Sequence, residues 1–196
     1  MILHIIIAAY KKAIATRGLI DSLILQTNKN WVTYVVHDGP PGEDFKAIQP
    51  LYKDEPRVGF YNSEVRFGCN GHLNRRMFLE GITGDPDDFV LITNCDNYYI
   101  PYFVNYMLRE AKRDVGIVYC NTLHSHNDYM VQVSKLELSG IDMGAFIVRL
   151  PLAQENGFNH CEYLAADGLY AEECAARCNQ KGLRTVHVNR VFFIHN

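Results

Sequence analysis

Residues 91–101 read LITNCDNYYIP and contain both the end of a buried strand and a cluster of polar side chains. The run 89–93 is apolar apart from Thr93, which is typical of a strand buried on both faces of a sheet. Asn94, Asp96 and Asn97 follow it directly. A carboxylate at the carboxyl edge of a sheet is well placed to hold a cation, and Asp is also common in turns that end strands. The stretch alone leaves both interpretations open.

The segments around this stretch alternate between strand and helix patterns. Strands are predicted at 2–10, 30–39, 57–62, 89–94 and 115–121. Helices are predicted at 12–27, 70–82 and 102–113, and a turn at 40–44 leads into a short helix that runs through Leu51. The connections are long enough for neighbouring strands to pair in parallel. We therefore expect an α/β sheet with helices on its faces.

The second half of the chain has a different pattern. Strands are predicted at 128–133 and 144–150 with no long helix between them, then a helix at about 168–181 that Gly182 ends, and strands at 184–188 and 191–196. No internal repeat, low-complexity tract or linker divides the chain. We expect one domain over residues 1–196, with a mixed, mostly parallel central sheet flanked by helices.

Composition restricts the possible classes of protein. The 196 residues are 48% hydrophobic and 21% charged, which suits one domain with a real core. A net charge of −3 gives no basic field for nucleic acid, and no apolar run is long enough to span a membrane. The start, MILHIIIAAYKK, becomes polar too soon for a signal peptide and predicts a first strand.

The six cysteines form no CxxC pair, and several lie in apolar runs. This pattern predicts reduced thiols and a cytoplasmic protein. Cys174 and Cys178 share a helical face, with His160 and Cys161 not far away in sequence. A zinc site is one interpretation, but the spacing matches no common zinc pattern, so core packing is favoured.

The predicted topology places a ligand site at one edge of the sheet. In open α/β sheets, ligands bind beyond the carboxyl ends of the strands. The polar residues at those ends are Tyr10, His37, Asp38, Asn94 and Asp96. No GxGxxG follows the first strand and no GxxxxGK[ST] loop occurs, which argues against a dinucleotide oxidoreductase or a P-loop NTPase.

Four segments, in order, resemble the GT-A fold glycosyltransferases, close to glycosyltransferase family 2. They are IIIAAYKKAIATRGLIDSLILQTNKNWVTYVVHDGP, FGCNGHLNRRMFLEGITGD, FVLITNCDNYYIP, and the pair GAFIVRLPLAQENGFN and AADGLYAEECAARCNQKGLRTVHV. The resemblance implies a Rossmann-like nucleotide-diphospho-sugar transferase fold. Residues 1–100 would form the nucleotide-binding half and residues 101–196 the acceptor half.

The resemblance implies sugar transfer from a nucleotide-diphosphate donor, expected to be a UDP-hexose, to a hydroxyl group of a glycan or another acceptor. Asp38 would accept the ring N–H of uracil, Tyr10 would offer a face to the base, and Asp142 would accept a sugar hydroxyl. The expected donor-binding residues are Ala8, Ala9, Tyr10, Asp38, Asn74, Asn94, Cys95 and Asp142. Simple turn roles for Asp38 and Asp142 stay open.

The resemblance also implies a divalent metal, Mn²⁺ or Mg²⁺. Asn94-Cys95-Asp96 stands where the family has Asp-x-Asp, so Asp96 would bind the ion while Asn94 contributes no charge. His195 is the expected second ligand, and an imidazole ligand favours Mn²⁺. The alternatives are a turn acid at Asp96 and a frayed end at His195.

An inverting transfer needs a carboxylate to take the acceptor proton. The region before and within the last predicted helix offers Glu162, Asp167, Glu172 and Glu173. Asp167 is the expected base, and Asp is also a favoured N-cap that the helix dipole keeps ionised. The alternatives are Glu162 and a retaining mechanism without such a base.

Two other functions compete with transfer. One is a nucleotide-sugar or carbohydrate-binding module without catalysis, which Asn94 and Leu73 keep open because the family has Asp and Arg at these places. The other is a sugar-1-phosphate nucleotidyltransferase, which AAYKKAIATRG fits poorly because it lacks a Gly-rich loop. His124 and His126, in LHSHND, are interpreted as part of a solvated loop over the acceptor.

Overall fold

Strand β1 (Leu3–Ala9) is central to the parallel part of the sheet. The structure is a computed structural model that describes residues 1–163 and 165–196. Strand β1 pairs in parallel with β2 (Trp31–His37) on one side and with β4 (Phe89–Asn94) on the other. Strand β3 (Val58–Asn62) extends the sheet beyond β2, also in parallel. All residues of β1 are buried, as its continuous apolar run predicted.

The same sheet continues into the second half of the chain. Strand β8 (Phe146–Arg149) pairs antiparallel with β4 and with β6 (Val115–His124), and β6 pairs in parallel with β9 (Arg184–His195). The short strand β5 (Tyr98–Tyr99) pairs antiparallel with β9, and the short strand β7 (Met130–Gln132) pairs antiparallel with β6. The strand order β3-β2-β1-β4-β8-β6-β9-β5 confirms one mixed α/β sheet, in which most paired residues lie in parallel ladders.

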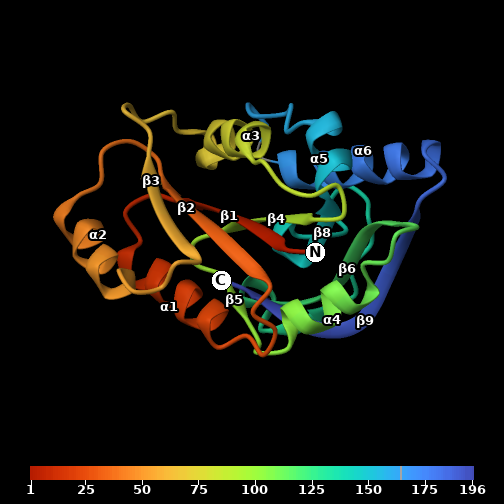
Figure 1. Cartoon of the computed structure of the whole chain (residues 1–196), viewed down its shortest axis with the longest axis horizontal. Helices are drawn as coiled ribbons and strands as arrows, with labels where there is room; N and C mark the ends of the chain where they lie inside the picture. Colours follow the sequence, from red (N-terminus) through yellow and green to blue (C-terminus); the bar gives the residue numbers. More distant parts are fainter. Residues whose placement is uncertain (164) are drawn as a thin grey trace.

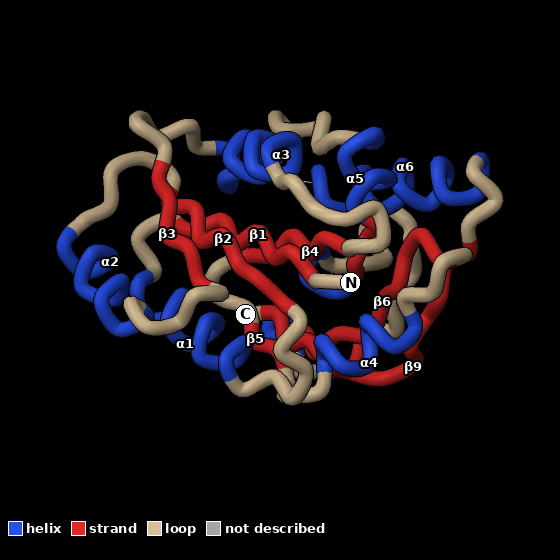
Figure 2. Tube along the Cα trace, in the orientation of Figure 1, coloured by secondary structure: helices blue, strands red, loops and turns tan. Residues whose placement is uncertain are grey.

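Helices cover both faces of this sheet (Figure 1, Figure 2). One face carries α1 (Ala13–Ile24), α2 (Glu43–Ile48) and α4 (Phe103–Glu110). The other face carries α3 (His72–Gly81), α5 (Leu150–Asn156) and α6 (Ala166–Gln180). The result is the three-layer arrangement predicted from the sequence.

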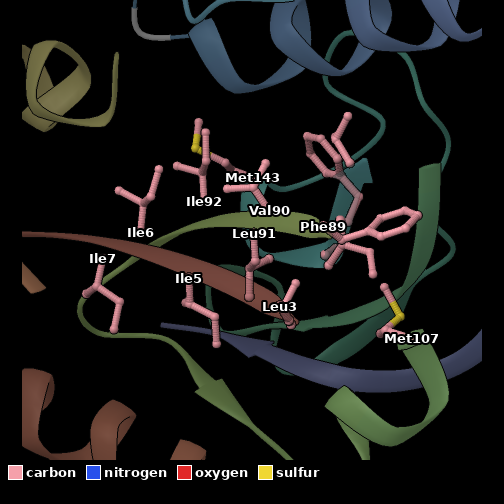
Figure 3. Packing of buried hydrophobic residues seen from close by; sticks show 14 of the residues in the cluster. Leu3, Ile5, Ile6, Ile7, Phe89, Val90, Leu91, Ile92, Met107 and Met143 are labelled. Carbon is pink, nitrogen blue, oxygen red and sulfur yellow. The ribbon is translucent and has the colours of Figure 1, made fainter. Parts of the chain in front are cut away.

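The core forms because side chains alternate across each strand. In Figure 3, Leu3, Ile5 and Ile7 point to one side of β1 and Ile6 points to the other. All four are completely buried. The apolar run of β1 therefore packs against both helical layers, which is why it carries no polar alternation.

Several predicted boundaries were wrong. The strands predicted at 184–188 and 191–196 are one strand, β9, with register shifts against β6 near Asn121. The strand predicted to run to residue 150 ends at Arg149, where α5 begins with a proline in its first turn. The helix predicted to reach residue 113 ends at Glu110. Neither α5 nor β5 was predicted, because elements this short show little periodicity.

All six cysteines are unpaired thiols. Cys174 and Cys178 are completely buried in the hydrophobic core. Within the described residues, no three His, Cys, Asp or Glu side chains are grouped so that they could hold a metal ion. The burial of both thiols in the core supports packing, which was the favoured interpretation of the Cys174–Cys178 pair.

A buried guanidinium joins the two halves of the sheet. Arg149 donates from Nε to the carbonyl of Val115 at 3.0 Å and from Nη2 to that of Lys112 at 2.6 Å. Its Nη1 donates to the carbonyl of Pro86 at 3.3 Å and to Asp87 Oδ1 at 2.8 Å. One side chain therefore fixes the loop before β4 to the loop before β6.

Replacing Arg149 by Met should leave these carbonyl groups without their donor while keeping most of the side-chain volume. We expect the free energy of unfolding to fall by about 3 kcal/mol, measured by urea denaturation. The exposed Arg109→Met is the matched control, expected to change stability by about 0.5 kcal/mol or less. Equal midpoints for the two variants would show that Arg149 does not join the halves.

Candidate functional site

A cleft of about 450 Å³ opens at the carboxyl ends of β1, β2 and β4. This is the edge at which the topology predicted a ligand. The predicted site residues that line the cleft are Ala8, Ala9, Tyr10, Asp38, Asn94, Cys95 and Asp96. The structure thus brings together most of the residues predicted to bind the donor, although they are far apart in the sequence.

Asp38 holds the loop that forms one wall of the cleft. Its carboxylate accepts the backbone N–H groups of Phe67 and Gly68, both at 2.9 Å. It also accepts Asn74 Nδ2, from α3, at 3.0 Å. Asp38 is only 4% exposed, so the carboxylate fixes the wall from below. Asn74 contributes to the site through Asp38.

Tyr10 and Arg66 meet above this carboxylate. The Arg66 guanidinium lies 4.0 Å from the centroid of the Tyr10 ring, and its Nε lies 3.9 Å from Asp38 Oδ2. Gly39 permits this approach, because it has φ +87° and an added Cβ would lie 3.2 Å from the backbone of Arg66. No local pattern marked Arg66 as a site residue, because only the folded loop brings it to Tyr10.

Asp96 lies across the cleft and faces a lysine. Lys12 Nζ lies 2.5 Å from Asp96 Oδ2. The hydrogen bond to Asp96 raises the pKa of the Lys12 ammonium against the lowering effect of burial. Asn196 Nδ2 donates to the backbone carbonyl of Asp96 at 2.9 Å, which brings the end of β9 to this carboxylate.

His195 belongs to a cluster of three imidazoles. Its ring stacks on His124 with centroids 4.2 Å apart, and His126 lies 5.5 Å from each of the other two. The prediction of a merely solvated loop was wrong for His124, because the parallel register of β6 and β9 pairs His124 with His195. Burial lowers the pKa of His195, which favours the neutral form that can bind a metal.

Asp142 lies beside this cluster. Its Oδ2 is 3.4 Å from His195 Nε2, and its Oδ1 accepts the N–H of Gly144 at 2.8 Å. The predicted turn role is therefore present, since Asp142 caps the 3₁₀ turn Met143–Ala145. Burial raises the pKa of Asp142 to about 6, and the charge of Asp167 adds to this rise.

A second unpredicted arginine lies beneath Asn94. The Arg75 side chain, 2% exposed, donates to Asn94 Oδ1 and, at 2.6 Å, interacts with His72 Nδ1. Burial, with a smaller contribution from the Arg75 charge, lowers the pKa of His72 to about 4. The side-chain oxygen of Asn94 is therefore directed to a buried cation.

Asp167 is not the N-cap of α6, contrary to the prediction. The N-cap is Ala165 and the helix begins at Ala166, so Asp167 lies within the first turn. Its Oδ1 accepts the N–H of Gly168 at 2.9 Å. An acid in the first turn still interacts favourably with the helix dipole. Its charge acts on Asp142, Arg75 and His195, which places it on the same side of the site.

The residues predicted to hold a metal fit an ion that is shared with a ligand. Asp96 offers carboxylate oxygens and His195 a neutral imidazole, whose Nδ1 is buried without a hydrogen-bond partner in the described residues. The charge of Asp96 is close enough to raise the pKa of His195 against the effect of burial. With no third ligand grouped with them in the described chain, other ligands must come from a bound molecule.

The family model described as glycosyl transferase family 2 matches residues 4–147. The chain belongs to this family. No curated protein sequence matches the chain. Among the described helices, none combines the length and the apolarity that crossing a membrane requires.

Solved structures show the same fold. S. aureus TarS is similar over 100% of this chain and 37% of its own, with TM-score 0.80 and 16% identity. TarS 1–349 in complex with UDP-GlcNAc is similar over 99% of this chain and 58% of its own, with TM-score 0.75 and 14% identity. Mannosyltransferase PcManGT from Pyrobaculum calidifontis, in complex with GDP-Man and Mn²⁺, is similar over 98% and 56%, with TM-score 0.72 and 16% identity.

These structures confirm the predicted GT-A fold. This chain spans between 37% and 58% of the length of these neighbours. At such low identity the likeness establishes the fold alone. The chemistry of this family 2 member must be argued from its own cleft.

Changing His72 to Gln should alter how stability depends on pH. The lowered pKa means that the neutral form stabilises the fold above the unfolded pKa of 6.5, and that this contribution is lost as the pH falls toward about 4. Between pH 7 and pH 5 the native protein should lose about 2 kcal/mol that the variant does not lose. Urea denaturation at both pH values checks this, and parallel losses would contradict it.

Proposed function

We propose that this chain transfers a sugar from a nucleotide-diphosphate donor to a hydroxyl group of an acceptor. The observation that carries the proposal is the cleft at the carboxyl ends of β1, β2 and β4, where Asp38 and Asp96 lie with the cations Lys12 and Arg66. Membership of glycosyl transferase family 2 supports the reaction class. The neighbours in complex with UDP-GlcNAc and GDP-Man support this donor class.

The donor is proposed to be a UDP-hexose, held by the first half of the chain. Among the residues that the structure describes, those that line the cleft come from positions 1–100, together with Asn196. Tyr10 provides a flat apolar surface for the base, and the wall held by Asp38 closes the base end. Lys12 and Arg66 supply the positive charge that a diphosphate needs. Residues 101–196 are proposed to form the acceptor half.

A divalent ion, Mn²⁺ or Mg²⁺, is proposed to share the diphosphate with Asp96 and His195. When bound, such an ion supplies positive charge that stabilises the departing diphosphate. The neighbour in complex with Mn²⁺ supports a metal of this kind. The imidazole ligand favours Mn²⁺.

The transfer is proposed to invert the anomeric carbon. Asp167 accepts the proton of the acceptor hydroxyl as that oxygen bonds to the anomeric carbon. The bond from this carbon to the diphosphate oxygen breaks, and the nucleoside diphosphate leaves with the electron pair. Asp142, beside His195, is proposed to accept a hydroxyl of the donor sugar. Arg75 holds Asn94 at the end of β4, where the diphosphate is proposed to lie.

One observation favours a second function. Asn94 is neutral and its oxygen is engaged by Arg75, while Asp96 is engaged by Lys12. A cleft of this kind would suit a module that binds a nucleotide sugar without turnover. Incubation with UDP-glucose, UDP-GlcNAc and GDP-mannose, each with Mn²⁺, separates the two. An enzyme releases UDP or GDP by transfer or slow hydrolysis, whereas a binding module retains the intact donor.

Asp38→Ala should weaken UDP binding about tenfold or more. The change leaves two backbone donors and Asn74 without their acceptor, at roughly 1–3 kcal/mol, so the wall of the cleft loses its position. Calorimetric titration with UDP measures the effect. Asp44→Ala, an exposed acid of α2, is the control expected to bind normally. Unchanged UDP affinity in Asp38→Ala would show that the nucleotide pocket lies elsewhere.

Asp167→Asn should lower sugar transfer by about a hundredfold or more while leaving folding and UDP binding intact. The amide keeps the shape and the bond to Gly168 but accepts no proton from the acceptor. Glu172→Gln, an exposed acid of the same helix, should transfer at the native rate. Steady-state rates with a saturating donor measure both. Survival of transfer in Asp167→Asn would move the base to Glu162 or favour a retaining mechanism.

A further inference from the structure

We propose that Lys12 is a built-in competitor of the divalent ion at Asp96. Its ammonium group occupies the carboxylate while the cleft is empty, and the ion gains Asp96 only when a nucleoside diphosphate draws Lys12 to itself. This inference rests on the proposed metal site at Asp96 and His195. It makes binding of the metal conditional on the donor.

The position of Lys12 suits this role. It is the N-cap of α1, directly after the turn in which Lys11 has φ +62°. Its backbone is fixed, because its N–H donates to the carbonyl of Tyr10 and its own carbonyl accepts both Oγ1 and the backbone N–H of Thr16. The side chain makes no capping bond and is 59% exposed. A fixed base with a free side chain lets the ammonium move while the loop stays in place.

The charges around Asp96 make the competition effective. Of the residues proposed to hold the metal, Asp96 supplies the carboxylate, since Asn94 is an amide and His195 an imidazole. Lys12 cancels the charge of this carboxylate at 2.5 Å. The buried Arg75 adds positive charge behind Asn94. A free divalent ion entering the empty cleft would therefore meet no net negative charge.

A nucleoside diphosphate reverses this balance. It brings several negative charges into a cleft that already holds Lys12 and Arg66. Lys12 can then exchange the carboxylate for phosphate oxygens, and Asp96 becomes available to the ion. Because the exchange replaces one partly exposed ion pair with another, it requires little free energy. The donor and the ion should consequently bind as a pair.

Lys12→Met tests the inference with Mn²⁺ alone and without nucleotide. The variant keeps the length of the side chain and removes its charge. We expect Mn²⁺ to bind about fivefold or more tightly than to the native chain, measured by calorimetry and by the loss of the free Mn²⁺ paramagnetic resonance signal. Lys12→Arg, which keeps a cation, should bind Mn²⁺ as weakly as the native chain.

Two further variants show that the gain belongs to this pair. Lys11→Met removes the neighbouring cation, which lies 5.3 Å from the Tyr10 ring centroid, and should leave Mn²⁺ binding unchanged. Adding Asp96→Asn to Lys12→Met should abolish the gain in Mn²⁺ affinity. The inference is overturned if Lys12→Met binds Mn²⁺ no better than the native chain, including the case in which neither binds it. It is also overturned if the gain persists without Asp96.

The readout needs neither sugar nor nucleotide, so it is independent of catalysis. If the native chain fails to transfer sugar but Lys12→Met binds Mn²⁺ more tightly, the role of Lys12 stands and the proposed function is wrong. If the native chain binds UDP with Mn²⁺ through Asp96 but Lys12→Met binds Mn²⁺ no more tightly, the proposed site stands and the role of Lys12 is wrong.

Discussion

The parallel pairing of β1 with both β2 and β4 is the constraint on which the site depends. Parallel strands end at the same edge, so Ala9, Asp38 and Asn94 are brought together although they lie far apart in sequence. The continuous apolar faces of these strands fix the pairing, since both sides must be covered by helices. The polar residues that line the cleft therefore lie at or beyond the strand ends. The cleft is a consequence of how the core is buried.

The sequence was most informative where one strong pattern decides the structure. The apolar runs of β1 and β4 predicted buried strands, and Asp38 and Asp96 at strand ends followed from the topology. Lys12, Arg66 and Arg75 were not predicted, because their partners lie across the fold and no local pattern marks them. The contact of His124 with His195 was missed for the same reason, because only the register of β6 and β9 brings the two together. The start of α6 was predicted two residues too late, with Asp167 as its N-cap, because Ala165 gives no capping signal.

Buried charge has different roles in the two parts of the fold. Arg149 binds backbone carbonyl groups and joins loops, so its role is structural. Asp38 is also structural, but its carboxylate accepts backbone N–H groups of the cleft wall instead of donating to carbonyl groups. Arg75 instead holds the side chain of Asn94 at the floor of the site. These buried groups position the exposed ones, so the composition of the cleft surface alone would not explain its shape.

The pairing of β6 with β9 has a consequence for the order in which the protein folds. Strands β1 and β2, which end at the Asp38 side of the cleft, pair residues that are close in sequence, as Leu3 pairs with Trp31, whereas His124 pairs with His195. Contacts of larger sequence separation cost more chain entropy and tend to form later. The wall around Asp38 can therefore become ordered while the imidazole cluster is still unformed.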